Sequence, residues 1–239
     1  MVFLGIGGIG MSALARHYLR LGSAVFGYDN SRTRITSALE QEGAQICYNE
    51  DLSHYPGWDS EETTVIYTPA VPKKLAWFNF FKAYNPIKRA QALALIANDH
   101  KCIAIAGTHG KTSTSAMLVH LMDQAGLDPT AFIGGIMTQT STNYRLGSSD
   151  FIIVEADEFD RSLLYLKPWA SAITTVDADH LDIYSDGKDL LDTFDAFVKQ
   201  TSGPTFTGSP IDHTIQIGSP ENHCWASAIE PKKGAYSFV

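Results

Sequence analysis

Two segments of this 239-residue chain each run from an apolar stretch through a glycine-rich loop into a helical pattern, and they constrain its fold more than any other feature. The first is VFLGIGGIGMSALA at the N-terminus, and the second is CIAIAGTHGKTSTSAML, about a hundred residues later. A strand that enters a helix through glycines is a phosphate-binding unit of parallel α/β sheets, because backbone amides at the helix N-terminus can approach an anion. The chain is therefore predicted to contain two nucleotide-type domains.

The first loop fits the pattern G-x-G-x-x-G through Gly5, Gly7 and Gly10. Asp29 ends the next predicted strand, about twenty residues further on, where dinucleotide-binding domains carry an acid that binds ribose. By itself this segment fits an NAD(P)-dependent oxidoreductase as well as a domain that binds another pyrophosphate.

The residues around the two loops alternate between strand-like and helix-like patterns, which indicates βα units and a parallel sheet. Strands are predicted over 2–6, 24–29, 63–71, 151–157 and 171–179, and helices over 10–22, 34–43 and most of 73–100 with a break near 85–86. The fold class is therefore α/β, with an N-terminal Rossmann-like domain and a central P-loop-type domain. We place the boundary near residues 98–101.

The second loop resembles a shortened P-loop, since the residue five positions before Gly110 is Ile105 and the first glycine is Gly107. The shortened loop can still bind a nucleotide, because Lys111 can reach terminal phosphates and the Thr112 hydroxyl can bind Mg²⁺. A nucleoside triphosphate site is favoured over a glycine turn that only tightens a strand-helix junction.

Acidic side chains follow two apolar strands. Glu155 comes directly after FIIV, and Asp177, Asp179, His180 and Asp182 follow ITTV. Carboxylate oxygens suit Mg²⁺, which binds one or two of them together with phosphate oxygens. The sequence thus predicts one metal position at Glu155 and a second at His180.

Two further acids, Glu158 and Asp160, follow Glu155 and fit either this metal site or a solvated loop.

Composition excludes several partners. The formal net charge is −8 and no run of Lys or Arg stands out, so neither nucleic acid nor an anionic membrane is an expected partner. Cys47, Cys102 and Cys224 are widely spaced and form no C-x-x-C pair, which favours a reducing, cytoplasmic location. No window approaches the roughly 20 apolar residues of a membrane span.

The segments GTHGKTST, IIVEADEFD and TTVDADHLD, preceded by GIGGIGMSALA, together resemble the Mur ligases of bacterial peptidoglycan synthesis over residues 2 to about 200. The resemblance implies a UDP-sugar-binding domain over 1–99 and an ATP-binding central domain over 100–239. It also implies that the central domain is incomplete and that a C-terminal, amino-acid-binding domain is absent. We therefore expect these 239 residues alone to bind nucleotide weakly and not to turn over.

The implied activity is the ATP-dependent joining of L-alanine to UDP-N-acetylmuramic acid through an acyl phosphate, with ATP and Mg²⁺ as cofactors. Three alternatives stay open: a ligase that joins the same UDP-sugar to a preformed tripeptide, the oxidoreductase, and a non-catalytic nucleotide-binding module. The sequence indicates neither the oligomeric state nor the choice between alanine and tripeptide.

The resemblance also implies roles for individual residues, with His109 facing both substrates. The UDP-sugar would contact Gly7, Gly8, Ile9, Gly10, Asp29 and His109. ATP would contact Gly107, Thr108, His109, Gly110, Lys111, Thr112 and Ser113. Magnesium would bind Thr112, Glu155 and His180, and the catalytic residues would be Lys111, Glu155 and His180.

Overall fold

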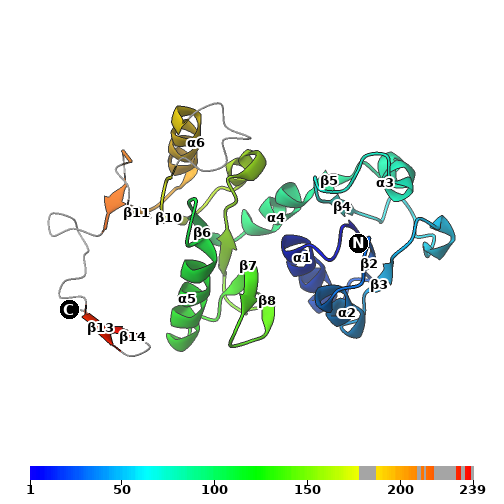
Figure 1. The fold of residues 1–239 in the computed structure, drawn as a ribbon, viewed down its shortest axis with the longest axis horizontal. Coiled ribbons are helices and arrows are strands. Elements are labelled where there is room, and N and C mark those ends of the chain that lie inside the picture. The colour runs from blue at the N-terminus through cyan, green and yellow to red at the C-terminus, as the bar shows by residue number, and fades with distance from the viewer. Residues whose placement is uncertain (178–186, 209–210, 213, 218–229, 233–234, 238–239) are drawn as a thin grey trace.

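The computed structural model describes residues 1–177, 187–208, 211–212, 214–217, 230–232 and 235–237. Two α/β units lie next to one another along the long axis of the molecule (Figure 1), and each contains its own sheet. The α/β fold class predicted from the sequence is confirmed. Residues 98–100 connect the last helix of the first unit to the first strand of the second.

The N-terminal unit contains a five-stranded, wholly parallel sheet in the order β3-β2-β1-β4-β5. Its strands are β1 (Val2–Leu4), β2 (Phe26–Tyr28), β3 (Gln45–Cys47), β4 (Val65–Tyr67) and β5 (Ile87–Lys88). Its α-helices are α1 (Ile9–Arg20), α2 (Arg34–Gln41), α3 (Ala76–Phe81) and α4 (Arg89–Ala97). All three residues of β1 are buried, because β1 is the central strand and is covered on both faces.

The second unit contains a seven-stranded sheet in the order β12-β11-β10-β6-β9-β7-β8. Its strands are β6 (Lys101–Ala106), β7 (Thr130–Met137), β8 (Thr142–Arg145), β9 (Phe151–Glu155), β10 (Ala170–Ile173), β11 (Thr205–Thr207) and β12 (Ile215–Gln216). Its α-helices are α5 (Lys111–Gln124) and α6 (Gly187–Gln200). Only β8 is antiparallel to its neighbour, so β7 and β8 form a hairpin at one edge. A separate hairpin pairs β13 (Glu230–Lys232) with β14 (Ala235–Ser237).

Most of the expected strands and helices form, and the differences arise where contacts with other chain segments decide the structure. The segment 73–100 is interrupted near Pro86, as predicted, but the short strand β5 follows the break and pairs with β4. The strands β3, β7 and β8 lie outside the elements predicted from the sequence. In β7 the pair Gly134-Gly135 interrupts the strand pattern of the sequence. The strand forms because it pairs with β8 and β9, although two glycines have low strand propensity.

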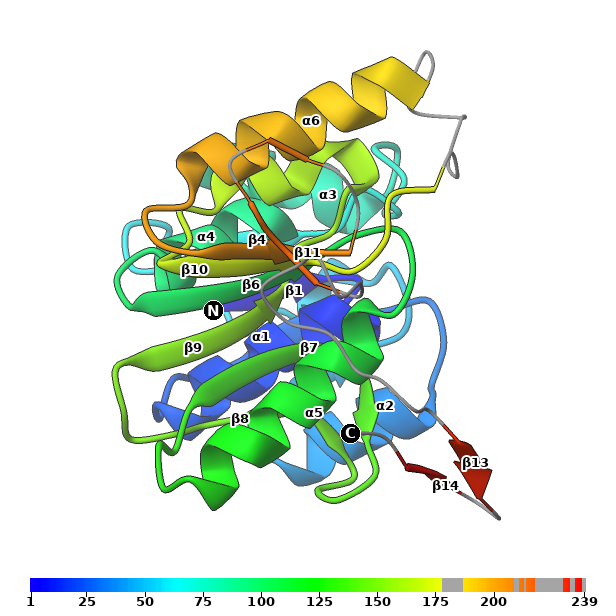
Figure 2. The ribbon, with the colours of Figure 1, turned by 90° about the vertical axis from the view of Figure 1, so that its left-hand side faces the viewer.

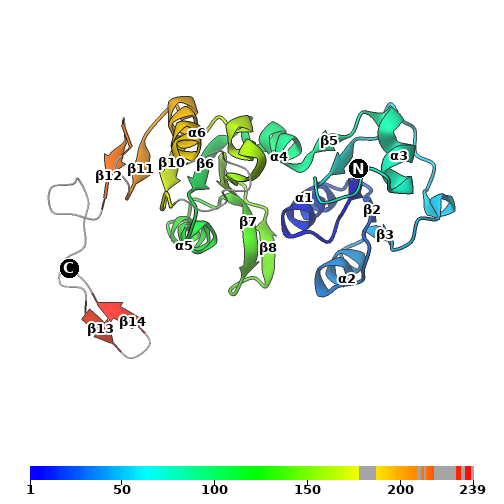
Figure 3. The same cartoon turned by 45° about the horizontal axis from the view of Figure 1, so that its top comes forward.

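The β7–β8 hairpin lies between α5 on one side and α1 of the other unit on the other side (Figures 2 and 3). The imidazole of His17 on α1 is buried there, and its Nδ1 lies 2.9 Å from the Tyr144 hydroxyl on β8. The rings of Tyr144 and Phe132 contact the His17 ring. We call this contact between α1 and β7–β8 the α1 interface.

No helix among the described residues is long and apolar enough to cross a lipid bilayer.

The α1 interface predicts a pH dependence of stability. Burial lowers the pKa of His17 to about 4, whereas an unfolded chain leaves a histidine near 6.5. The unfolded state therefore binds the proton more tightly, and the contribution of neutral His17 to stability is lost as the pH falls from about 6.5 towards 4. Urea unfolding of the parent chain and of His17→Gln at pH 7.5 and 5 measures this, and the variant should lose less stability. An equal loss in both proteins would assign the effect to other groups.

Candidate nucleotide and substrate site

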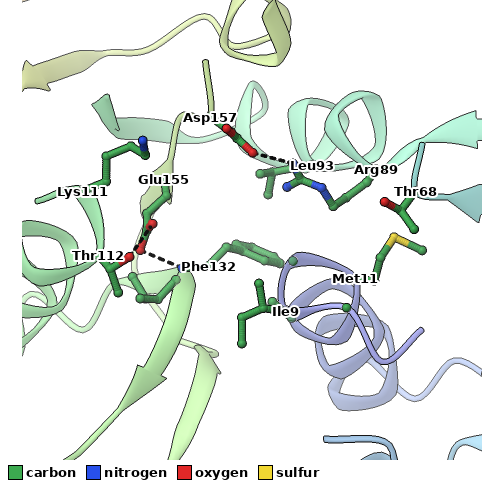
Figure 4. A pocket seen from close by; sticks show the side chains of 15 residues that line it. Ile9, Met11, Thr68, Arg89, Leu93, Lys111, Thr112, Phe132, Glu155 and Asp157 are labelled. Carbon is green, nitrogen blue, oxygen red and sulfur yellow. Dashed lines mark hydrogen bonds and ion pairs between the residues drawn. The ribbon is translucent and has the colours of Figure 1, made fainter. Parts of the chain in front are cut away.

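A cavity of about 420 Å³ lies where the two units meet (Figure 4). The start of α1 contributes Gly8, Ile9 and Gly10 to its wall, and the start of α5 contributes Lys111 and Thr112. Further lining residues are Met11, Ala13, Thr68, Arg89, Leu93, Phe132, Ile133, Gly134, Glu155 and Asp157. The helix starts that follow the two glycine loops therefore face one shared space.

The second loop adopts a conformation that requires glycine at two positions. Gly107 has φ +120° and Gly110 has φ +81°, in the region that side chains disfavour. A Cβ on Gly107 would also meet the Thr175 carbonyl oxygen at 2.8 Å. The loop is held to the segment after β10, because the Thr108 amide donates to Thr175 O and the His109 amide donates to Thr175 Oγ1, at 2.9 and 3.0 Å.

Lys111 lies at the first position of α5, and its ammonium group has partners within the loop. Its Nζ donates to Gly107 O at 2.5 Å and to the Glu158 carboxylate at 2.8 Å. Glu158 is 2% exposed, so the interpretation of this acid as part of a solvated loop is wrong. Asp160 instead is exposed and pairs with Lys88 at 2.6 Å. A buried carboxylate that pairs with Lys111 keeps the cation beside the phosphate loop.

Glu155 ends β9 at the cavity wall, where two hydrogen bonds orient its carboxylate. The Gly134 amide donates to Oε1 at 2.7 Å, and the Thr112 hydroxyl donates to Oε2 at 3.0 Å. Burial raises the pKa of Glu155 above its usual value, against the opposing effect of these hydrogen bonds. A hydroxyl and a carboxylate at this separation are oxygen donors that fit Mg²⁺ together with phosphate oxygens.

Some amides of the first loop donate hydrogen bonds within the protein, and others have no partner within the helix. Gly7 N–H donates to Asp29 Oδ2 at 2.8 Å, and Gly8 N–H donates to Gly5 O at 3.1 Å. The amides of residues 9–11 precede the first i to i−4 bond of α1, from Ser12 N–H to Gly8 O, and have no partner within the helix. An anion at this helix start would therefore use the amides of residues 9–11.

Arg89, the first residue of α4, lines the same cavity and was missed in the sequence. Its guanidinium packs over Gly10, where an added Cβ would lie 2.9 Å from Nη1, and its Nη2 lies 3.3 Å from Asp157 Oδ2. The available signal was the basic pair Lys88-Arg89 at the start of a helix that directly follows a strand. This places an arginine beside the amides that could receive a pyrophosphate.

Several predicted site residues do not line this cavity. The side chain of His109 is exposed, with Nε2 3.8 Å from Asp177 Oδ2, and Ser113 lines a separate groove beside α5. The remaining predicted contacts outside the lining are Gly7, Asp29, Gly107, Thr108 and Gly110. His180 lies outside the described residues.

Two family models match the chain. "Mur ligase family, catalytic domain" matches residues 1–101, and "Mur ligase middle domain" matches residues 105–208. A UDP-N-acetylmuramate–L-alanine ligase of Christiangramia forsetii is 42% identical over 246 residues, which covers 99% of this chain and 54% of the relative. The chain thus spans about half the length of the curated relatives that it matches.

Solved structures agree in fold. The UDP-N-acetylmuramate-alanine ligase MurC of Thermotoga maritima superposes with a TM-score of 0.80 at 27% identity, over 95% of this chain and 55% of that one. The UDP-N-acetylmuramate:L-alanyl-gamma-D-glutamyl-meso-diaminopimelate ligase of Neisseria meningitides also gives 0.80, at 22% identity, over 96% of this chain and 80% of that one. The second likeness, at its lower identity, concerns the fold alone.

The position of the Glu155 carboxylate depends on the absence of a side chain at residue 134. In Gly134→Ala the new Cβ would overlap Glu155 Oε2, so the carboxylate must leave the Gly134 amide and the Thr112 hydroxyl. For a metal ligand, losing a group that orients it weakens metal binding by about 10- to 100-fold. If Glu155 holds Mg²⁺ together with the phosphates of ATP, we expect a loss of this size in Mg²⁺ affinity, measured by calorimetry with ATP at a series of Mg²⁺ concentrations.

Gly208→Ala is the matched control for this substitution. It also adds one methyl group in the second unit, but the nearest atom to its Cβ lies at an ordinary 3.5 Å. Equal Mg²⁺ dependence in the two variants would remove Glu155 from the metal site.

Proposed function

The chain belongs to the Mur ligase family, and from this premise we propose that it forms the UDP-sugar-binding and ATP-binding parts of an enzyme that joins L-alanine to UDP-N-acetylmuramic acid. The observation that supports the proposal most is the cavity lined by the starts of both α1 and α5, the helices that follow the two phosphate loops. Such a ligase must bring a carboxylate on one nucleotide substrate to the terminal phosphate of another, which calls for two phosphate sites that face each other.

In this proposal, residues 1–99 bind the UDP-sugar. The pyrophosphate lies at the start of α1, on the amides of Ile9 and Gly10, with the Arg89 guanidinium beside it. Gly7 and Asp29 support this loop through their mutual hydrogen bond. Asp29 is proposed to lie near the nucleoside on the resemblance alone.

In the second unit, residues 107–113 bind the phosphates of ATP. Lys111 exchanges its contact with Gly107 O for the phosphate oxygens, while Glu158 keeps the ammonium group from swinging away. Thr112 and Glu155 would hold Mg²⁺, which when bound neutralises phosphate charge. His180 is proposed for a second metal position on the resemblance alone.

The chemistry requires the lactyl carboxylate of the UDP-sugar to attack the γ-phosphorus of ATP, with ADP as the leaving group. The acyl phosphate then accepts the amine of alanine at its carbonyl carbon, and inorganic phosphate leaves. Both steps accumulate negative charge, which Lys111 is placed to stabilise. The apolar side chains of Met11, Leu93 and Phe132 line the same cavity and limit the water that competes with the amine.

The alternatives receive different support. Both the alanine ligase and the tripeptide ligase fit the fold equally, with TM-scores of 0.80. The alanine substrate is favoured because curated relatives 42 and 46% identical carry that name. An oxidoreductase is not supported, since it has no use for the second phosphate loop with Glu155 beside it. We also propose a cytoplasmic location and no nucleic-acid or membrane partner.

The proposal predicts ADP release from the full-length protein that depends on both UDP-N-acetylmuramic acid and L-alanine. A coupled assay with L-alanine or the tripeptide L-alanyl-D-glutamyl-diaminopimelate in parallel should give at least tenfold higher kcat/KM for alanine. Preference for the tripeptide would support the recycling ligase, and no ADP release with either acceptor would contradict the proposed activity.

Lys111→Met, in a Glu158→Gln background that leaves no buried carboxylate unpaired, should lower kcat by about a hundredfold or more. The Kd for UDP-N-acetylmuramic acid should change less than about twofold, because that site lies on the other unit. Glu158→Gln alone and the exposed Lys101→Met serve as controls. Loss of UDP-sugar binding in the double variant would contradict the division of the two substrates between the units.

A further inference from the structure

The α1 interface has a polar centre built around Asn143 of β8, whose side chain is fully buried. Its Nδ2 donates to the Ile9 carbonyl at 2.5 Å and to Ser12 Oγ at 3.1 Å, and its Oδ1 accepts from Arg16 Nη1 at 2.5 Å. All three partners belong to α1 of the other unit. One side chain of the second sheet therefore holds the first two turns of this helix.

The charge in this centre is balanced. Arg16 is 6% exposed, and its Nε donates to both carboxylate oxygens of Glu42, at 2.9 and 3.1 Å. Asn143 thereby connects β8 to the Arg16–Glu42 ion pair of the N-terminal unit, in which the arginine is buried. Buried polar groups with all partners in place favour one arrangement, because a shifted arrangement would leave donors or acceptors unpaired.

The group that Asn143 holds is part of the cavity wall. Ile9 lines the cavity next to Gly8 and Gly10, and the β7 residue Phe132 lines it from the other unit. Phe132 is paired in register with Tyr144, the residue after Asn143. A displacement at Asn143 would therefore change the distance between Ile9 at the start of α1 and Phe132 on β7, which line the cavity from the two units.

Resting on the proposed function, we propose that Asn143 is a positioning residue for the transfer step. It sets the distance between the UDP-sugar on α1 and the ATP held at Lys111, so that the substrate carboxylate and the γ-phosphorus meet. Each substrate binds within its own unit, but reaction needs an approach of about 3 to 3.5 Å, and a misplacement of about 1 Å can cost about a hundredfold in rate. Asn143 therefore acts on kcat rather than on either binding equilibrium.

The test uses Asn143→Asp in the full-length protein, since aspartate has nearly the same shape. Its carboxylate still accepts from Arg16, but it places an oxygen instead of an N–H group against the Ile9 carbonyl. We expect kcat to fall by about 30- to 100-fold. The Kd for UDP-N-acetylmuramic acid and the KM for ATP should each change less than about threefold. Asn143→Ala should show the same division between kcat and binding.

Arg145→Ala is the matched control on the same strand. Arg145 donates to Pro129 O at 2.7 Å and pairs with Asp128 at 2.7 Å, so its side-chain partners stay within the second unit. It should lower the melting temperature without a comparable loss of kcat. If kcat falls equally in Asn143→Asp and Arg145→Ala, or is unchanged in Asn143→Asp, the positioning role is overturned.

Hydrogen exchange separates this proposal from the proposed function. In Asn143→Asp the amides of residues 12–17 in α1 should exchange faster than in the parent protein, while those of β6 keep their protection. Hydrogen exchange can be measured without turnover. If the parent protein lacks ligase activity, the proposed function is overturned, but the contact between Asn143 and α1 can still be tested. Unchanged exchange in α1 would overturn the link.

Discussion

The packing of α1 against the β7–β8 hairpin is the contact on which the candidate site depends. The topology of each sheet determines the position of one phosphate loop. The chain passes from β1 into α1, and from β6 into α5, at the carboxyl edge of the parallel strands. Sheet topology does not bring the two edges together. The α1 interface brings Ile9 and Lys111 to the walls of the same cavity, together with the pairs Lys88–Asp160 and Arg89–Asp157, which also join the two units.

The features that could be predicted from the sequence are those that depend on consecutive residues. Both glycine loops, the strands that precede them and the acid at the end of β9 are local patterns, and the structure places Lys111, Thr112 and Glu155 together as the patterns indicate. The hairpin could not be predicted in this way. Its strand β7 contains Gly134-Gly135, and the need for glycine there is visible only once the Glu155 carboxylate lies against it.

The partners of the polar side chains depended on contacts between distant residues. Asp29 carries the expected spacing from the first loop, yet its carboxylate accepts the Gly7 amide that we expected to face a pyrophosphate. Glu158 fitted a solvated loop equally well in sequence, but it lies buried against Lys111, 47 residues away. In both cases the residue type showed that an acid was present, whereas only the fold determined which donor it met.

The chemistry of the α1 interface also explains why a polar centre suits this position. An apolar contact of the same size would hold α1 on the hairpin but would tolerate small sliding motions, since apolar attraction depends on buried area rather than on direction. Hydrogen bonds from Asn143 to Ile9 and from Arg16 to Asn143 are directional, and a slide of one ångström would break them in a buried environment. Burying such groups adds little net stability but restricts the units to one relative position. A cavity that must align two phosphate-bearing substrates requires that restriction more than it requires added stability.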